Sequence, residues 1–225
     1  MSEGGVHKRH ELRRDLRLVA DMVAAGSRVL DVGCGDGALL AVLAREKGVD
    51  GRGIELSQAG VNACVAHGLS VIQGDADTDL ADFPDTSFDY AILSQTLQAV
   101  RRPREVLRHL LRIGTRAIVS FPNFGYWRAR HYLFVKGRMP LTTMLDLPWY
   151  ATTNIHPCTI TDFLDLCRAS GFTIERAYAL SHDGRASPID NGFAINLFAE
   201  QAIFELSGRG SRLARAGEPS AEQAD

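Results

Sequence analysis

The chain has 225 residues, of which 45% are hydrophobic and 23% charged, so it is large enough to bury a core and is neither disordered, collagen-like nor a coiled coil. Its 25 basic and 27 acidic side chains give a net charge of −2, too weak an overall field to attract nucleic acid or an anionic membrane. The four cysteines show no metal or disulfide spacing, and no apolar run reaches the ~18 residues of a membrane helix. We therefore expect a cytoplasmic protein without a structural metal.

The apolar period alternates between two and 3.6 along the chain, which is typical of an α/β fold. We predict one Rossmann-like domain at 11–206 with a doubly wound, mostly parallel sheet of seven strands, between a flexible N-terminus at 1–10 and a disordered tail at 207–225. The predicted helices lie at about 12–25, 37–47, 58–67, 103–113 and 159–170. The predicted strands lie at about 28–32, 51–55, 69–73, 88–93, 116–121, 172–180 and 193–206.

Local signals mark the starts of several helices. Ser57 is a predicted N-cap, and Pro103 stands where helices tend to begin. Thr159 and Asp162 have the spacing of a capping box. Only about a dozen residues, without a helical pattern, separate the last two predicted strands, so we expect this pair to be antiparallel.

The stretch 123–158 is irregular and contains both tryptophans, so we expect an insertion beside the functional site. Its aromatic side chains are equally compatible with the wall of a substrate pocket and with the core of the insertion; they are Tyr126, Trp127, Trp149 and Tyr150. In the same stretch His156 is a candidate for acid–base chemistry, but we prefer a structural role in which its hydrogen bonds fix a loop.

A glycine-rich turn joins the first predicted strand to the second predicted helix. Gly33, Gly35 and Gly37 let the backbone approach a ligand closely, and the helix N-terminus offers unpaired N–H groups. The same spacing, with Ala38, also satisfies the dinucleotide fingerprint, so the glycines alone do not distinguish NAD from S-adenosylmethionine. Asp31, just before the first glycine, favours the second ligand, because a carboxylate repels a pyrophosphate and attracts a sulfonium and an ammonium group.

Two further acids follow the next two predicted strands. Glu55 ends the second strand, from which a carboxylate can accept both ribose hydroxyls. Asp75 follows the third strand and could accept a hydrogen bond from the adenine amino group. Because open α/β sheets bind ligands at the carboxyl ends of their strands, these positions predict a cofactor site along one edge.

At this point the chain resembles the class I S-adenosylmethionine-dependent methyltransferases and, within them, the methionine biosynthesis protein MetW family. The resemblance covers about residues 12–200 and rests on four segments: Ser27-Arg-Val-Leu-Asp-Val-Gly-Cys-Gly-Asp-Gly37, Leu93-Ser-Gln-Thr-Leu-Gln98, Val119-Ser-Phe-Pro-Asn-Phe124 and Trp149-Tyr-Ala-Thr-Thr-Asn-Ile-His-Pro-Cys158. The predicted cofactor contacts are Asp31, Gly33, Cys34, Gly35, Gly37, Glu55, Leu56, Asp75, Ala76 and Ser94. The resemblance also implies a role in methionine synthesis beside a homoserine O-acyltransferase.

Whether the chain is an enzyme stays open at this stage. Methyl transfer needs an aligned nucleophile and, for a protonated acceptor, a base, yet the segment 94–98 after the fourth predicted strand contains no acid and no histidine. One hypothesis is therefore a binding subunit that supports or regulates homoserine acylation. The alternative is an active S-adenosylmethionine-dependent methyltransferase with a small-molecule acceptor.

Charge is distributed unevenly along the chain. Residues 75–89 contain six acids and no base, whereas residues 101–138 contain ten basic residues and one acid. Arg104, Arg108 and Arg112 repeat every four residues and share one face of a predicted helix. A solvated face is the simpler interpretation; our hypothesis is that this stripe meets the acyltransferase, and RNA binding is less favoured because no RNA-binding motif is present.

Overall fold

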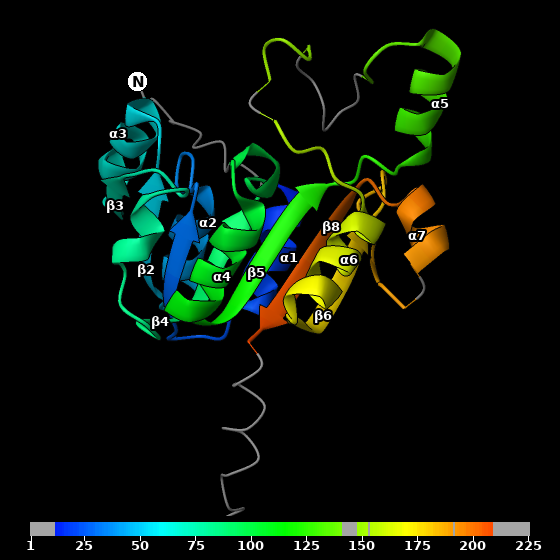
Figure 1. Ribbon diagram of the computed structural model, residues 1–225. Helices are drawn as coiled ribbons and strands as arrows, with labels where there is room; N and C mark the ends of the chain where they lie inside the picture. The colour runs from blue at the N-terminus through cyan, green and yellow to red at the C-terminus, as the bar shows by residue number, and fades with distance from the viewer. Residues whose placement is uncertain (1–11, 141–147, 153, 191, 209–225) are drawn as a thin grey trace, which may run out of the picture.

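The strands of this protein form a single mixed sheet. The computed structural model describes residues 12–140, 148–152, 154–190 and 192–208, and its eight strands have the order β3-β2-β1-β4-β5-β8-β6-β7 (Figure 1). Strands β1 to β5 run parallel, whereas β8 is antiparallel to both β5 and β6, and β7 is antiparallel to β6. The strands are β1 (Arg28–Val32), β2 (Asp50–Glu55), β3 (Ser70–Gln73), β4 (Phe88–Ser94), β5 (Gly114–Pro122), β6 (Thr173–Leu180), β7 (Ala186–Pro188) and β8 (Gln201–Ser207).

Helices cover both faces of the sheet. Helices α1 and α2 pack on one face, with α3 beside α2, and α4 and α6 pack on the other (Figure 1). The α-helices are α1 (Arg14–Met22), α2 (Ala38–Lys47), α3 (Gln58–Ala66), α4 (Pro103–Ile113), α5 (Trp127–Lys136), α6 (Ile160–Ser170) and α7 (Gly192–Phe198). Two short 3₁₀ helices are η1 (Asp79–Asp82) and η2 (Leu97–Ala99). No helix among the described residues is long and apolar enough to span a membrane.

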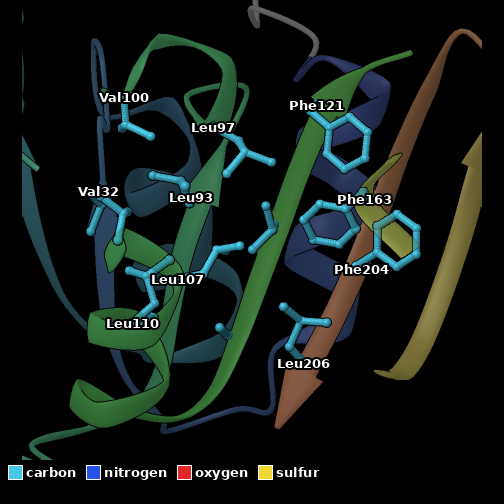
Figure 2. Packing of buried hydrophobic residues seen from close by; sticks show 14 of the residues in the cluster. Val32, Leu93, Leu97, Val100, Leu107, Leu110, Phe121, Phe163, Phe204 and Leu206 are labelled. Carbon is cyan, nitrogen blue, oxygen red and sulfur yellow. The ribbon is translucent and has the colours of Figure 1, made fainter. Parts of the chain in front are cut away.

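The larger core lies between the sheet and helices α4 and α6. Figure 2 shows Phe121, Phe163 and Phe204 packed together, and the ring centroids of the last two are 4.6 Å apart. All three side chains are buried, which fixes α6 over β5 and β8. The antiparallel end of the sheet is therefore joined to the parallel part by continuous apolar packing.

Helix ends follow the predicted signals. The Ser57 hydroxyl accepts a hydrogen bond from the Gly60 N–H at 3.4 Å, so Ser57 is the N-cap of α3. Thr159 and Asp162 form the reciprocal bonds of a capping box at the start of α6, and Pro103 is the first residue of α4. These local signals set the residues at which the three helices begin.

One predicted strand was wrong in its first half. Residues 193–206 contain α7 followed by β8, and the segment between β6 and α7 contributes the unpredicted strand β7, which raises the strand count to eight. The predicted antiparallel arrangement of the terminal strands is confirmed. Within the predicted insertion at 123–158 the structure contains α5, whereas 141–147 and 153, like both chain ends at 1–11 and 209–225, lie outside the described residues.

A fully buried carboxylate links three elements near the antiparallel strands. Glu205 of β8 has no exposed side-chain surface and forms ion pairs with Arg116 of β5 and Arg176 of β6. Arg176 also donates a hydrogen bond to the carbonyl oxygen of Met22 at 2.9 Å. Because burying an unpaired charge is costly, the two arginines are needed for this carboxylate to sit inside the fold.

Candidate functional site

Two adjoining cavities lie at the carboxyl ends of the parallel strands. The larger, of about 670 Å³, lies beside the loop after β1, and the smaller, of about 300 Å³, lies beside the ends of β2 and β3. They share Gly33, Gln95 and Thr96 in their linings. All the predicted cofactor contacts except Gly37 line one cavity or both, so the fold brings together residues that are up to 63 positions apart, from Asp31 to Ser94.

The glycine loop needs its glycines for two different reasons. Gly33 has a φ of +73°, and a Cβ there would lie 2.6 Å from the Thr96 hydroxyl oxygen, so the backbone passes close to the loop after β4. Gly35 has a φ of +58° and borders open space. Gly37 has a φ of +79°, and a Cβ there would lie 2.3 Å from a methyl carbon of Leu69. Gly37 therefore permits packing against α3 and its following loop, whereas the first two glycines shape the cavity.

Asp31 is a buried carboxylate with an unsatisfied oxygen. It is the penultimate residue of β1 with 2% of its surface exposed, it lines the larger cavity, and its Oδ1 atom has no hydrogen-bond partner among the described residues. Burial, and secondarily the charge of Glu55, raises the pKa of Asp31 to about 7. An unpaired buried oxygen is costly, so this position fits a ligand that brings a cationic group or a hydrogen-bond donor.

Glu55 holds the glycine loop in position. Its Oε2 atom accepts a hydrogen bond from the Gly35 N–H at 2.9 Å, and its Oε1 atom accepts one from the Ser57 N–H at 2.8 Å. Each carboxylate oxygen can accept a second bond, so these contacts leave capacity for the two hydroxyls of a ribose. The same side chain thus shapes the loop and lines the smaller cavity.

Asp75 has one oxygen tied into its own turn. Its Oδ1 atom accepts a hydrogen bond from the Asp77 N–H at 2.9 Å, and its N–H donates to Asp79 at the same distance. The other carboxylate oxygen of Asp75 makes no hydrogen bond within the described residues. Asp75 lines the smaller cavity together with Leu56 and Ala76. It can therefore accept a bond from a bound ligand.

Several lining residues were missed from the sequence. Gln95 lines both cavities, has a φ of +55°, and donates from its side chain to Gln201 of β8 at 2.9 Å. A positive φ is unusual for a residue with a side chain and often marks a functional position. The other missed residues include Thr96, His67, Leu12, Leu16 and Arg101. Gln95 and Thr96 could have been predicted from their place directly after β4. His67 reaches the cavity from the end of α3, and no local sequence pattern indicates that contact.

The predicted residues of the insertion lie elsewhere. Tyr126 is buried at the start of α5, whereas Trp127, Trp149 and Tyr150 are exposed, and none of the four lines the two cavities in the described part of the chain. The His156 ring nitrogen Nε2 lies 3.2 Å from the carbonyl oxygen of Arg101, in agreement with the preferred loop-fixing role. The substrate-wall interpretation stays a prediction.

The three arginines of the α4 stripe, Arg104, Arg108 and Arg112, differ in their contacts with the rest of the chain. The Arg112 side chain donates to the carbonyl oxygens of Leu80 and Phe83 at 2.8 and 2.6 Å and pairs with Asp85 at 2.5 Å. Arg112 therefore fixes the η1 segment against α4, and the hypothesis of a three-residue docking stripe stays a prediction. Arg104 and Arg108 are exposed and make no hydrogen bond or ion pair within the described residues.

The sheet topology and the position of the two cavities at the carboxyl ends of the parallel strands indicate the class of protein. The fold is that of S-adenosylmethionine-dependent methyltransferases: a crystal structure from Thermotoga maritima, described as a possible histamine N-methyltransferase, aligns with a TM-score of 0.64 and 18% identity over 87% of this chain and 88% of that one. At this identity the likeness shows the fold alone. Residues 13–206 match the family model of the methionine biosynthesis protein MetW, and the chain belongs to that family.

Curated relatives agree with both assignments. A bifunctional methionine biosynthesis protein MetXA/MetW of Rhodopirellula baltica is 38% identical over 164 residues, which are 69% of this chain and 26% of that protein. The chain therefore spans about a quarter of that relative's length. A demethylmenaquinone methyltransferase of Listeria welshimeri is 27% identical over 192 residues, which are 76% of this chain and 80% of that protein.

Proposed function

We propose that this MetW-family protein binds S-adenosylmethionine along the edge formed by β1, β2 and β3. The observation that carries the proposal is the unsatisfied, buried oxygen of Asp31, which lines the same cavity as Gly35, where a Cβ would meet no other atom within 4 Å. A cationic ligand relieves the cost of this carboxylate, whereas a pyrophosphate would increase it. The residues present thus fit the cofactor better than they fit a dinucleotide.

Each acid has a separate role in this proposal. Asp31 attracts the cationic amino-acid end of the cofactor, helped by the loop residues Gly33 and Gly35. Glu55 accepts the ribose hydroxyls while keeping its own bond to the loop, and the available oxygen of Asp75 accepts the adenine amino group. When bound, the cofactor supplies an electrophilic methyl group on a sulfonium; the protein's part is to orient it.

We further propose that the protein supports or regulates a homoserine O-acyltransferase in methionine synthesis. Two facts support this role: membership of the MetW family, and the relative that joins MetXA and MetW in one chain. Fusion keeps two units at a high effective concentration, which is useful where they act together. In this role S-adenosylmethionine, made from the methionine that the pathway supplies, is the signal that the chain binds.

The second candidate is a methyltransferase that acts on a small molecule. The observation that favours it is the imidazole of His67 in the lining of the larger cavity, which also contains Asp31. Histidine is the commonest general base in enzymes, and a base is what the segment after β4 does not provide. Under this alternative, His67 would accept the proton of an acceptor held near Leu12 and Leu16.

One experiment separates the two candidates. The full chain is titrated calorimetrically with S-adenosylmethionine and then incubated with methyl-labelled cofactor and cell metabolites, with and without the purified acyltransferase. We expect cofactor binding, a change in acyltransferase rate when the chain is added, and no labelled product from the chain alone. Labelled product that disappears in His67→Ala would favour the methyltransferase, and an acyltransferase rate indifferent to the chain would contradict the partner role.

A further inference from the structure

Helix α5 leaves large apolar side chains in solvent. Leu133, Phe134 and Val135 are consecutive and are 51%, 90% and 55% exposed. Consecutive helical residues point about 100° apart, so these three side chains cover more than half of the helix circumference. Of the ten residues of α5, only Ala129 is buried. A helix that is apolar over so much of its circumference is normally packed against another surface.

The charge on this segment restricts what can cover it. Residues 127–139 contain four basic side chains and no acid, and Lys136 and Arg138 flank the apolar run at its C-terminal side. A second copy of this chain would bring the same positive charges together across a two-fold axis. The composition instead fits a different protein with an apolar groove bordered by acidic side chains, which is the way amphipathic helices are usually bound.

We infer that α5 is the helix by which this protein docks on the homoserine O-acyltransferase. The inference rests on the proposed function, and the fused MetXA/MetW relative is the observation that favours this partner over other acidic surfaces. Helix α4, whose arginines were our first hypothesis, is less suitable. Its apolar residues Val106, Leu107 and Leu110 are buried in the core, so its outer face offers charge without an apolar centre.

The base of α5 is held rigidly by the core. The buried Asn123 side chain donates to the carbonyl oxygens of Asn196 and Ala199, both at 2.8 Å, and accepts a bond from the Gly125 N–H at 2.9 Å. Figure 1 shows α5 standing beyond the end of the sheet at which β5 finishes, which is also the end that bears the two cavities. A pre-positioned helix loses little entropy on binding and places the partner at the cofactor end of the sheet.

The test compares two exposed apolar residues on different helices. Phe134→Asp changes α5, and Val65→Asp changes a side chain that is 58% exposed on α3. For each full-length variant, affinity for the purified acyltransferase is measured by biolayer interferometry and affinity for S-adenosylmethionine by calorimetry. We expect Phe134→Asp to weaken association by about tenfold or more, as for a central interface residue, and Val65→Asp to leave it within about twofold. Cofactor affinity should be unchanged in both.

A charge variant gives a second, independent measurement. Lys136→Glu with Arg138→Glu should slow association and reduce its dependence on salt, whereas Arg104→Glu with Arg108→Glu should have no effect. Wild-type affinity in both α5 variants, or a loss caused by the α4 variant alone, would overturn the inference and leave the proposed function intact. The inference would also be overturned if Phe134→Asp abolished dimerisation of the wild-type chain, or its binding to anionic vesicles, while binding to the acyltransferase persisted. If the wild-type chain neither binds nor affects the acyltransferase, the proposed function itself fails.

Discussion

The buried carboxylate of Asp31 makes cofactor affinity depend on pH. Burial and the nearby Glu55 raise the pKa of Asp31 to about 7, so the group is largely protonated at pH 6 and largely ionised at pH 8. Only the ionised form attracts a cation strongly. If binding requires the carboxylate, the competent fraction rises from about one tenth to about nine tenths, and the apparent affinity for S-adenosylmethionine should rise about tenfold over these two pH units.

Asp31→Asn provides the matched control, because it keeps the size of the side chain and removes its titration. Calorimetric titrations at pH 6, 7 and 8 should give this variant a weaker affinity for S-adenosylmethionine and a flatter pH dependence. The pH dependence that remains in the variant measures the contribution of the cofactor's own amino group. Proton release on binding, measured in buffers of different ionisation enthalpy, should be largest below pH 7 in the wild type. A flat wild-type profile, or an equally steep profile in Asp31→Asn, would refute the role assigned to this carboxylate.

The same pKa has a consequence for the stability of the ligand-free protein. Because the pKa of Asp31 is raised in the folded state, the folded protein binds more protons than the unfolded chain between about pH 4 and pH 7. Its contribution to the free energy of unfolding is therefore fully present below pH 4 and is lost as the pH rises through 7. The shift corresponds to about 4 kcal/mol, which urea unfolding of the wild type and Asp31→Asn over this range should reveal as a difference in slope.

Three further substitutions test the site and the fold. Glu55→Ala removes an acceptor that bonds the Gly35 N–H, and calorimetry should show cofactor affinity about tenfold to hundredfold weaker; unchanged affinity would remove the ribose assignment. Gly37→Ala should cost about 2–5 kcal/mol in urea unfolding and Gly35→Ala only about 1–2, because a Cβ overlaps a neighbour at the first position alone; equal losses would contradict this packing. Glu205→Gln should cost about 3–5 kcal/mol and Glu105→Gln, in an exposed pair, less than about 1; a small loss at Glu205 would mean that its arginines are dispensable.

The parallel half of the fold was predictable because local signals there agree with the tertiary structure. Strands β1, β4 and β5 each contain a short apolar run, and capping residues such as Ser57 or glycines such as Gly48 bound the helices of this half. The positions of Asp31, Glu55 and Asp75 follow from the same rule, since successive parallel strands present their carboxyl ends on one edge. The sequence could thus predict which residues meet there, but not that one Asp31 oxygen would lack a partner.

The missed features depend on contacts that no local pattern encodes. The run 193–206 is largely apolar, and short apolar runs do not distinguish a helix from a strand. In the structure its first half is helical, and there the Asn196 carbonyl oxygen and side chain accept hydrogen bonds from the Asn123 side chain and the Ile160 N–H. Helix α5 was hidden for the opposite reason. Its apolar residues follow one another instead of recurring every three or four positions, so it lacks the stripe of a core helix.

Part of the uneven charge along the chain is paired within the fold. Acids of the segment 75–89 lie against the basic helix α4: Asp77 accepts hydrogen bonds from the backbone N–H groups of Arg101 and Arg102 at 2.8–3.1 Å, and Asp85 pairs with Arg112. The two oppositely charged segments therefore contact each other in the fold. No acid within the described residues pairs with Lys136 of α5. The unpaired charge of Lys136 thus lies two residues from Phe134, the most exposed phenylalanine among the described residues, where an acidic, apolar partner would satisfy both.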